Sequence, residues 1–274
     1  MPANIAQAVA LAAALTATQG LANPPGSAPT RQATQLDLTT PFHTRSAWRL
    51  VVTEGTPVKD YGDNDAPGAL TLCLRNGPSG TCVADPVTVP LPTSPSNDAP
   101  AWEPHYLLAA KVVYPRGPTA PPLLLIVTGS LNAGDGDQIV STQLVRYVPA
   151  RDTFQRVFAG NTGHNNNQEI RFMTAGALRG SVITAEPEEH RPYGYQIVVH
   201  QADVAGVYRP VLRYRSATIY GDGNPLAVID SEMPSIEQRL GVWRPGMPLP
   251  TPQVGGDGKP CLKPALKHGE LWCG

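Results

Sequence analysis

The residues best suited to chemistry lie in a short polar loop in the second half of the chain, Gly163-His-Asn-Asn-Asn-Gln-Glu169. Its three asparagines exceed what a turn needs, and asparagine both donates and accepts hydrogen bonds, as a sugar or another polar ligand requires. A second turn, Gly221-Asp-Gly-Asn224, adds a carboxylate and an amide. For each loop the alternative interpretation is an ordinary turn. We predict a ligand site from these residues of the two loops: His164, Asn165, Asn166, Asn167, Glu169, Asp222 and Asn224.

Neither loop completes a catalytic signature. The chain contains no Gly-x-Ser-x-Gly, no His-Glu-x-x-His, no Walker loop and no Gly-x-Gly-x-x-Gly before a helix. A carboxylate pair for glycoside hydrolysis needs only spatial proximity, so its presence is not readable from spacing. We therefore favour a non-catalytic function. The alternative is a hydrolase of cell-envelope or polysaccharide material that uses Glu169, Asp222 or His164.

The turn Asp135-Gly-Asp137 is a candidate calcium site. Calcium takes oxygen ligands from tightly turned loops, and two carboxylates flank the glycine here. The EF-hand spacing, which needs a glutamate at the twelfth loop position, is not met. Asp-Gly is also a common hairpin turn. We favour the hairpin turn and no cofactor, with calcium at Asp135 and Asp137 as the alternative.

The elements that must position these loops are predicted to be β-strands. From His105 onward, β-branched and alternating stretches are separated by short turns, in two successive sets of four. A unit of about 50 to 60 residues with four strands is typical of a propeller blade or a β-meander. The segment 48–89 resembles a third, degenerate unit, and three units are fewer than a closed propeller uses. We predict an all-β fold of repeated four-stranded antiparallel meanders, blade-like, in an open stack or distorted sandwich.

One short helix is predicted near the C-terminus, because Ser235-Ile-Glu-Gln238 fits a capping box and Gly241 can end the helix. Proline- and glycine-rich stretches mark the remaining boundaries. The predicted organisation is a signal peptide (1–22), a flexible leader (23–45), a β domain (46–243) with a possible boundary in the 90–104 loop, and a disulfide-tethered tail (244–274).

The N-terminus predicts export. An apolar stretch, 5–15, precedes Gln19-Gly-Leu-Ala22, which fits cleavage after Ala22, although no Lys or Arg lies near Met1. A buried N-terminal helix is the alternative, and the stretch is shorter than the roughly 20 residues of a membrane span.

The cysteines agree with export, because the four of them form two local pairs without Cys-x-x-Cys spacing. We favour two structural disulfides over free thiols, within the pairs Cys73 and Cys82, and Cys261 and Cys273. The protein is then periplasmic or secreted, in a bacterium. The formal net charge of -1 gives no electrostatic reason to expect nucleic acid as a partner.

Two segments, Asn165-Asn-Asn-Gln-Glu169 and 214–234, resemble parts of exported proteobacterial proteins without an assigned function. The resemblance extends over most of the chain after Ala22. It implies that the protein is exported, and it implies no catalytic residues. We expect a binding or envelope-structural module whose partner is an envelope component or a small polar ligand.

Overall fold

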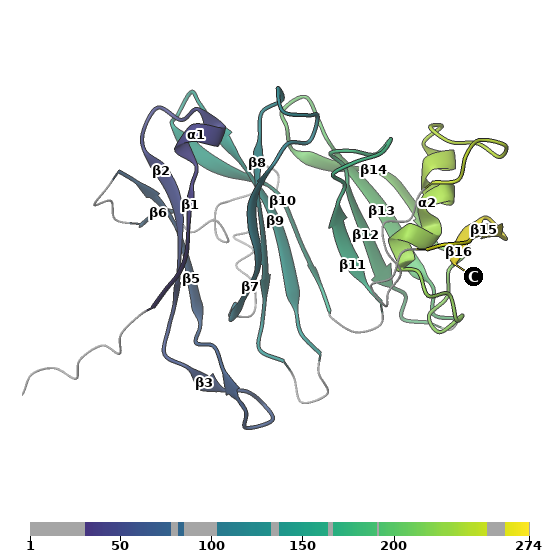
Figure 1. The fold of residues 1–274 in the computed structure, drawn as a ribbon, viewed down its shortest axis with the longest axis horizontal. Helices are drawn as coiled ribbons and strands as arrows, with labels where there is room; N and C mark the ends of the chain where they lie inside the picture. The colour runs from purple at the N-terminus through teal and green to yellow at the C-terminus, as the bar shows by residue number, and fades with distance from the viewer. Residues whose placement is uncertain are drawn as a thin grey trace, which may run out of the picture.

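Three four-stranded antiparallel sheets follow one another along the chain and stand side by side (Figure 1). The computed structural model describes residues 31–77, 82–84, 103–132, 137–163, 167–190, 192–250 and 261–273. The predicted all-β fold of four-stranded antiparallel sheets with a short helix near the C-terminus is confirmed. The predicted signal peptide and the 90–102 part of the predicted boundary loop lie outside the described residues.

Each sheet is a meander of neighbouring strands. The first sheet has the order β1 (Arg31–Asp37), β2 (Trp48–Glu54), β5 (Leu70–Asn76) and β6 (Cys82–Ala84). The middle sheet consists of β7 (Tyr106–Val113), β8 (Leu123–Gly129), β9 (Val140–Val148) and β10 (Thr153–Thr162). The third sheet consists of β11 (Glu169–Phe172), β12 (Val182–Pro187), β13 (Tyr195–Ala202) and β14 (Tyr208–Arg215).

Smaller elements complete the fold. They are α1 (Thr39–Phe42), the ribbon of β3 (Val58–Lys59) with β4 (Asp65–Ala66), α2 (Val228–Arg239), and the hairpin of β15 (Pro264–Lys267) with β16 (Glu270–Cys273). No helix among the described residues is both long enough and apolar enough to cross a membrane.

Strand β8 explains why the middle sheet is so apolar. Side chains alternate across a strand, so its two faces bury separate sets of residues. Leu124 and Ile126 join the core between the first and middle sheets, whereas Leu123 and Leu125 join the core between the middle and third sheets. Because both faces are covered, the strand is a continuous aliphatic stretch instead of an alternating one.

A third core lies on the far face of the third sheet, under α2 (Figure 1). Ile183 and Ile197 of the sheet contact Ile229 and Ile236 of the helix, and all four side chains are fully buried. The helix therefore covers the last sheet face, which would otherwise expose an apolar surface to water.

The predicted start of this helix was wrong. The helix begins at Val228, seven residues before Ser235, and the Ser235 hydroxyl donates to the Gly269 carbonyl oxygen (3.2 Å) instead of capping. Pro234 precedes the serine and imitates a helix start, although here it lies inside the helix. The predicted end is confirmed, because Gly241 follows the helix with a φ of +73°.

Residues 31–42, which sequence patterns assign to a flexible leader, form β1 and α1. Strand β1 pairs with β2 along the first sheet, and Leu38 and Phe42 are buried in its core. The alternating polar and apolar residues between Thr34 and Leu38 are the signal for this edge strand.

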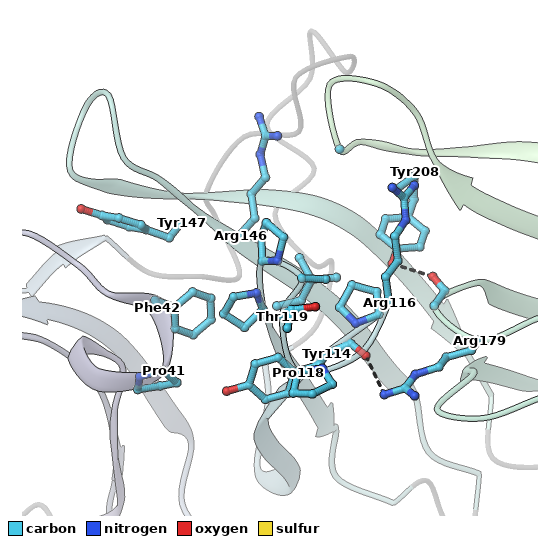
Figure 2. Close-up of a pocket in the computed structure, with 18 of the residues that line it drawn as sticks. Pro41, Phe42, Tyr114, Arg116, Pro118, Thr119, Arg146, Tyr147, Arg179 and Tyr208 are labelled. Atoms are coloured by element: carbon cyan, nitrogen blue, oxygen red, sulfur yellow. Dashed lines mark hydrogen bonds between the residues drawn. The ribbon is translucent and has the colours of Figure 1, made fainter.

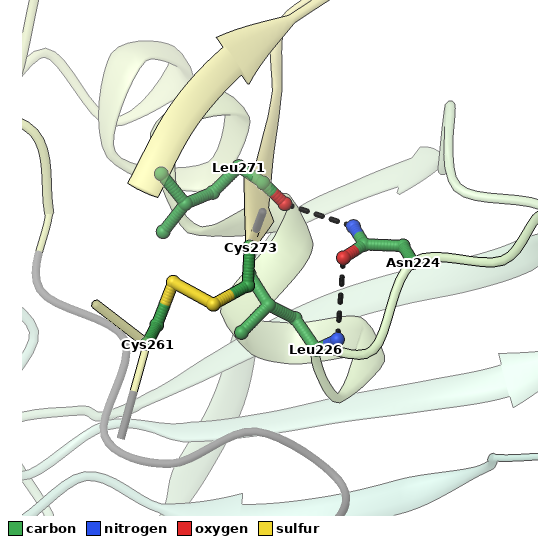
Figure 3. The surroundings of a disulfide bond; sticks show 5 residues. All are labelled: Asn224, Leu226, Cys261, Leu271 and Cys273. Atoms are coloured by element: carbon green, nitrogen blue, oxygen red, sulfur yellow. Dashed lines mark hydrogen bonds between the residues drawn. A yellow bond between two sulfur atoms is a disulfide. The ribbon is translucent and has the colours of Figure 1, made fainter. Parts of the chain in front are cut away.

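Both predicted disulfides are present, and no cysteine is free. Cys73–Cys82 joins β5 to the edge strand β6. Cys261–Cys273 ties the C-terminal segment to the end of β16, beside α2 (Figure 3). The first bridge therefore fastens an edge strand to its neighbour, and the second fastens the residue at the start of the C-terminal described segment to the last strand.

Candidate functional site

The two polar loops that sequence patterns single out meet at one end of the third sheet, around Tyr195. This tyrosine is buried, and burial raises its pKa to about 12, with further upward contributions from the charges of Asp222 and Glu169. A hydrogen bond with the Asn167 side chain lowers the pKa of Tyr195. Asn167, Glu169 and Asp222 therefore all lie within electrostatic or hydrogen-bonding range of this tyrosine. His164, Asn165 and Asn166 lie outside the described residues.

Glu169 is held by structural contacts. One carboxylate oxygen accepts a hydrogen bond from the Ile229 backbone N–H (2.6 Å), and the other accepts from Arg171 Nη2 (2.8 Å). Arg171 Nη1 also donates to Asp230 Oδ1 (2.6 Å). Burial raises the pKa of Glu169, and the Arg171 guanidinium opposes this shift.

These contacts make Glu169 the N-terminal cap of α2. The N-cap residue Ala227 provides no side-chain hydrogen bond, so the first turn of the helix needs an acceptor from elsewhere. A carboxylate there also interacts favourably with the helix dipole. The geometry therefore gives Glu169 a structural role that sequence patterns did not predict.

Asp222 and Asn224 form a turn that is hydrogen-bonded to the C-terminal hairpin. Asp222 Oδ1 accepts the Asn224 backbone N–H (2.8 Å). The Asn224 amide donates to the Leu271 carbonyl oxygen of β16 and to Ser231 Oγ of α2, both at 2.9 Å, and its oxygen accepts from Leu226 (Figure 3). The polar atoms of Asn224 are thus used to join the helix and the hairpin.

The predicted calcium turn is described only in part, since Asp135 lies outside the described residues. Asp137 Oδ1 accepts the backbone N–H of Gln138 (2.9 Å), as in an ordinary Asp-containing turn. Among the described residues there is no group of three or more metal-ligating side chains. Calcium binding at this turn stays a prediction.

A feature that sequence patterns did not indicate is a groove of about 1290 Å³ beside α1 and the ends of the middle and third sheets, here called the inter-sheet groove (Figure 2). Its walls come from α1, from the proline-rich β7–β8 loop (114–122), from the end of β9, and from the β11–β12 and β13–β14 turns. Figure 2 shows Phe42 and Tyr147 on one side and Arg116, Arg179 and Tyr208 on the other.

The wall formed by the first and middle sheets is fixed by Asp152. Its carboxylate accepts hydrogen bonds from Ser46 Oγ (2.5 Å), Trp48 Nε1 (3.0 Å) and the Tyr147 hydroxyl (2.6 Å). The hydrogen bonds from Ser46 and Tyr147 lower the pKa of Asp152. The Tyr147 oxygen also accepts the Arg45 backbone N–H (3.0 Å), so this side of the groove is preorganised.

The wall formed by the middle and third sheets is fixed by Arg146. Its guanidinium donates to the Ala205 carbonyl oxygen in the β13–β14 turn and to Gln155 Oε1 (2.9 Å) on β10. The turn approaches closely, because a Cβ atom at Gly206 would lie 2.7 Å from Arg146 Nη1. Glycine is favoured there by its φ of +74°, whereas the contact with the flexible end of Arg146 could be relieved by movement of that side chain.

Most of the charged side chains that line the groove are arginines. Arg116, Arg146 and Arg179 line it, and Asp203 is the one carboxylate among the described lining residues. Hydrogen bonding to the Val207 backbone N–H lowers the pKa of Asp203, which therefore stays ionised and is unsuited to proton donation.

A second, smaller cavity of about 320 Å³ lies between the middle and third sheets, and Glu169 is the carboxylate among its described lining residues.

No protein-family model, curated protein or solved structure matches the chain. The structure therefore defines a disulfide-bonded, all-β protein with a groove beside α1 and the ends of the middle and third sheets.

Proposed function

We propose that this protein is an exported, non-catalytic binding module and that its ligand lies in the inter-sheet groove. The observation that carries the proposal is the groove itself, about 1290 Å³ in volume and lined by α1 and by the middle and third sheets with their loops. Ligand sites are usually concave, largely pre-formed and lined by aromatic side chains with a few polar groups. Phe42, Tyr114 and Tyr208 supply the aromatic surface here.

Preorganisation supports the proposal. The hydrogen bonds to Asp152 and from Arg146 hold both walls before any ligand arrives. A site that is already ordered loses less conformational entropy on binding than one that must assemble. Export is supported by the two disulfides, because disulfides persist mainly in oxidising compartments outside the cytoplasm.

The alternative, a polysaccharide hydrolase, requires two carboxylates on opposite sides of the scissile bond. The described lining of the inter-sheet groove offers Asp203, and that of the smaller cavity offers Glu169. Both oxygens of Glu169 already accept hydrogen bonds from Arg171 and Ile229. These contacts favour the binding module.

The test is a variant that fills the groove. Thr119 is exposed at the centre of the β7–β8 loop, so Thr119→Trp should block the groove without disturbing a core (Figure 2). Thr71→Trp, on an exposed position of β5 that does not line the groove, is the matched control.

The assay measures co-sedimentation of the full chain with insoluble peptidoglycan and with an acidic and a neutral polysaccharide gel. We expect binding to one of these materials, unchanged in Thr71→Trp and reduced at least about tenfold in Thr119→Trp. Equal binding by the two variants would show that the ligand lies elsewhere. Release of reducing sugar ends that disappears in Glu169→Ala would favour the hydrolase instead.

A further inference from the structure

We propose that one wall of the inter-sheet groove binds the carboxylates of an acidic polysaccharide. The wall, here called the arginine corner, consists of Tyr114, Arg116, Arg179 and Tyr208 (Figure 2). The inference depends on the proposed function of the groove and specifies the chemistry of its ligand.

The four residues of the arginine corner are held together by contacts between two loops. Arg179 Nη2 donates to the Tyr114 carbonyl oxygen (3.4 Å), and the Tyr208 hydroxyl donates to the Gly180 carbonyl oxygen (2.8 Å). A Cβ atom at Gly180 would lie 2.6 Å from the Pro115 carbonyl oxygen, so the loops touch. Arg116 follows Pro115 and Arg179 precedes Gly180 in the sequence, and both arginines line the same side of the groove (Figure 2).

Neither arginine of the corner has a carboxylate partner among the described residues. Three arginines elsewhere in the described part of the chain do have carboxylate partners: Arg171 with Glu169 and Asp230, Arg209 with Asp203, and Arg215 with Glu188. The carboxylate of Asp203, which lines the same groove, is thus already engaged by Arg209. The corner therefore keeps two positive charges that no described acidic side chain neutralises.

The Arg116 guanidinium lies beside Tyr208, whereas that of Arg179 turns to the Tyr114 carbonyl oxygen, so each can bind a separate planar oxyanion (Figure 2). Guanidinium binds carboxylate through two parallel hydrogen bonds, which gives both strength and orientation. Arg116 is exposed and makes no hydrogen bond within the described part of the chain, so all of its donors face solvent or a ligand.

The position of the groove disfavours a peptide that would add to a sheet as a further strand. The groove runs across the ends of strands, where loops and turns form its walls. A peptide that adds to a sheet needs the free edge of a strand for its backbone hydrogen bonds. A sugar ring instead places its apolar face on aromatic or proline side chains, such as Tyr114 and Pro118, while its carboxylate reaches an arginine.

The test uses oligogalacturonate and oligomannuronate as acidic probes and the methyl ester of oligogalacturonate as the matched uncharged probe. Isothermal titration calorimetry measures Kd for the wild-type chain and for the variants Arg116→Gln and Arg179→Gln. Arg213→Gln is the control, because Arg213 is exposed on β14 and does not line the groove. We expect an acidic probe to bind the wild-type chain. Each of the two corner variants should raise Kd about tenfold, and the Kd of the control should match that of the wild type.

Several outcomes would overturn the inference. One is that neither acidic probe binds. Another is that Arg213→Gln loses as much affinity as the two corner variants. A third is that the methyl ester binds as tightly as the acid. Tighter binding of polyglutamate than of either glycan would replace the glycan with an acidic peptide. If the methyl ester binds equally and Thr119→Trp blocks it, the acidic ligand is refuted while the groove remains the binding site. If Thr119→Trp leaves the binding of every probe unchanged, the groove itself is refuted.

Discussion

Replacing Glu232 by alanine should be among the most damaging single changes in this protein. The side chain is fully buried on α2, and its carboxylate accepts four hydrogen bonds. The donors are the Tyr214 hydroxyl (2.8 Å), the backbone N–H groups of Ala217 (3.0 Å) and Thr218 (2.9 Å), and the Thr218 hydroxyl (2.8 Å). These bonds join α2 to the segment that follows β14.

The magnitude follows from the donors that are left behind. A buried donor that loses its acceptor costs about 1–3 kcal/mol, and the effects within one network are not additive. Alanine at position 232 leaves the Thr218 N–H and both hydroxyl groups without this acceptor. We therefore expect a loss of about 3–5 kcal/mol, a large part of the roughly 5–15 kcal/mol that stabilises a typical domain.

Two further variants make the measurement decisive. Glu232→Gln keeps the shape and one carbonyl acceptor, so it should lose about half as much free energy of unfolding. Gln238→Ala, at an exposed position of the same helix, should change that free energy by less than about 0.5 kcal/mol. The assay is urea unfolding of the oxidised protein, followed by circular dichroism. A loss below about 1 kcal/mol in Glu232→Ala, or one equal to that of Gln238→Ala, would refute this account of the network.

Two other predictions concern single carboxylates. Hydrogen bonds from neighbouring side chains lower the pKa of Asp152 in the folded protein. Its ionised form therefore contributes stability above the ordinary carboxyl pKa, and this contribution is lost as the pH falls through the lowered value. The Tm difference between wild type and Asp152→Asn should be largest near neutral pH and vanish in acid; a difference independent of pH would contradict this. Because Asp137 is engaged in its own turn, Tm should be the same in calcium and in a chelator. A higher Tm in calcium would instead support a site at Asp135 and Asp137.

The strands were predictable because their signals are local. The aliphatic stretch of β8 and the alternation in β9 to β14 carry the period of an extended chain, and each four-strand set is closed by short turns. The close spacing of Cys73 with Cys82 and of Cys261 with Cys273 likewise allowed the disulfide pairs to be predicted. Each of these features depends on residues that lie near one another in the sequence.

The start of α2 and the groove were not predictable for the opposite reason. The cap of α2 comes from Glu169, which lies 60 positions before Ile229, while a local pattern at Ser235 imitated a start. The groove combines α1 with turns as distant as the one before Tyr208, and each of these turns by itself has an ordinary composition. Whether Arg116 has an ion-pair partner also cannot be predicted from the sequence, because this depends on which side chains lie beside it in the folded protein.

The two polar regions of this molecule differ in one respect that decides their roles. Around Glu169, Glu232 and Asn224, described donors and acceptors satisfy one another, so the network is complete without a ligand. Burial of such groups is favourable only when they are satisfied, which explains why the conspicuous Asp and Asn residues lie there. At the arginine corner, the positive charges of Arg116 and Arg179 have no described counter-charge, and the groove is open. A binding site needs such unmet bonding capacity, and for this reason the groove is the first place to search for a ligand.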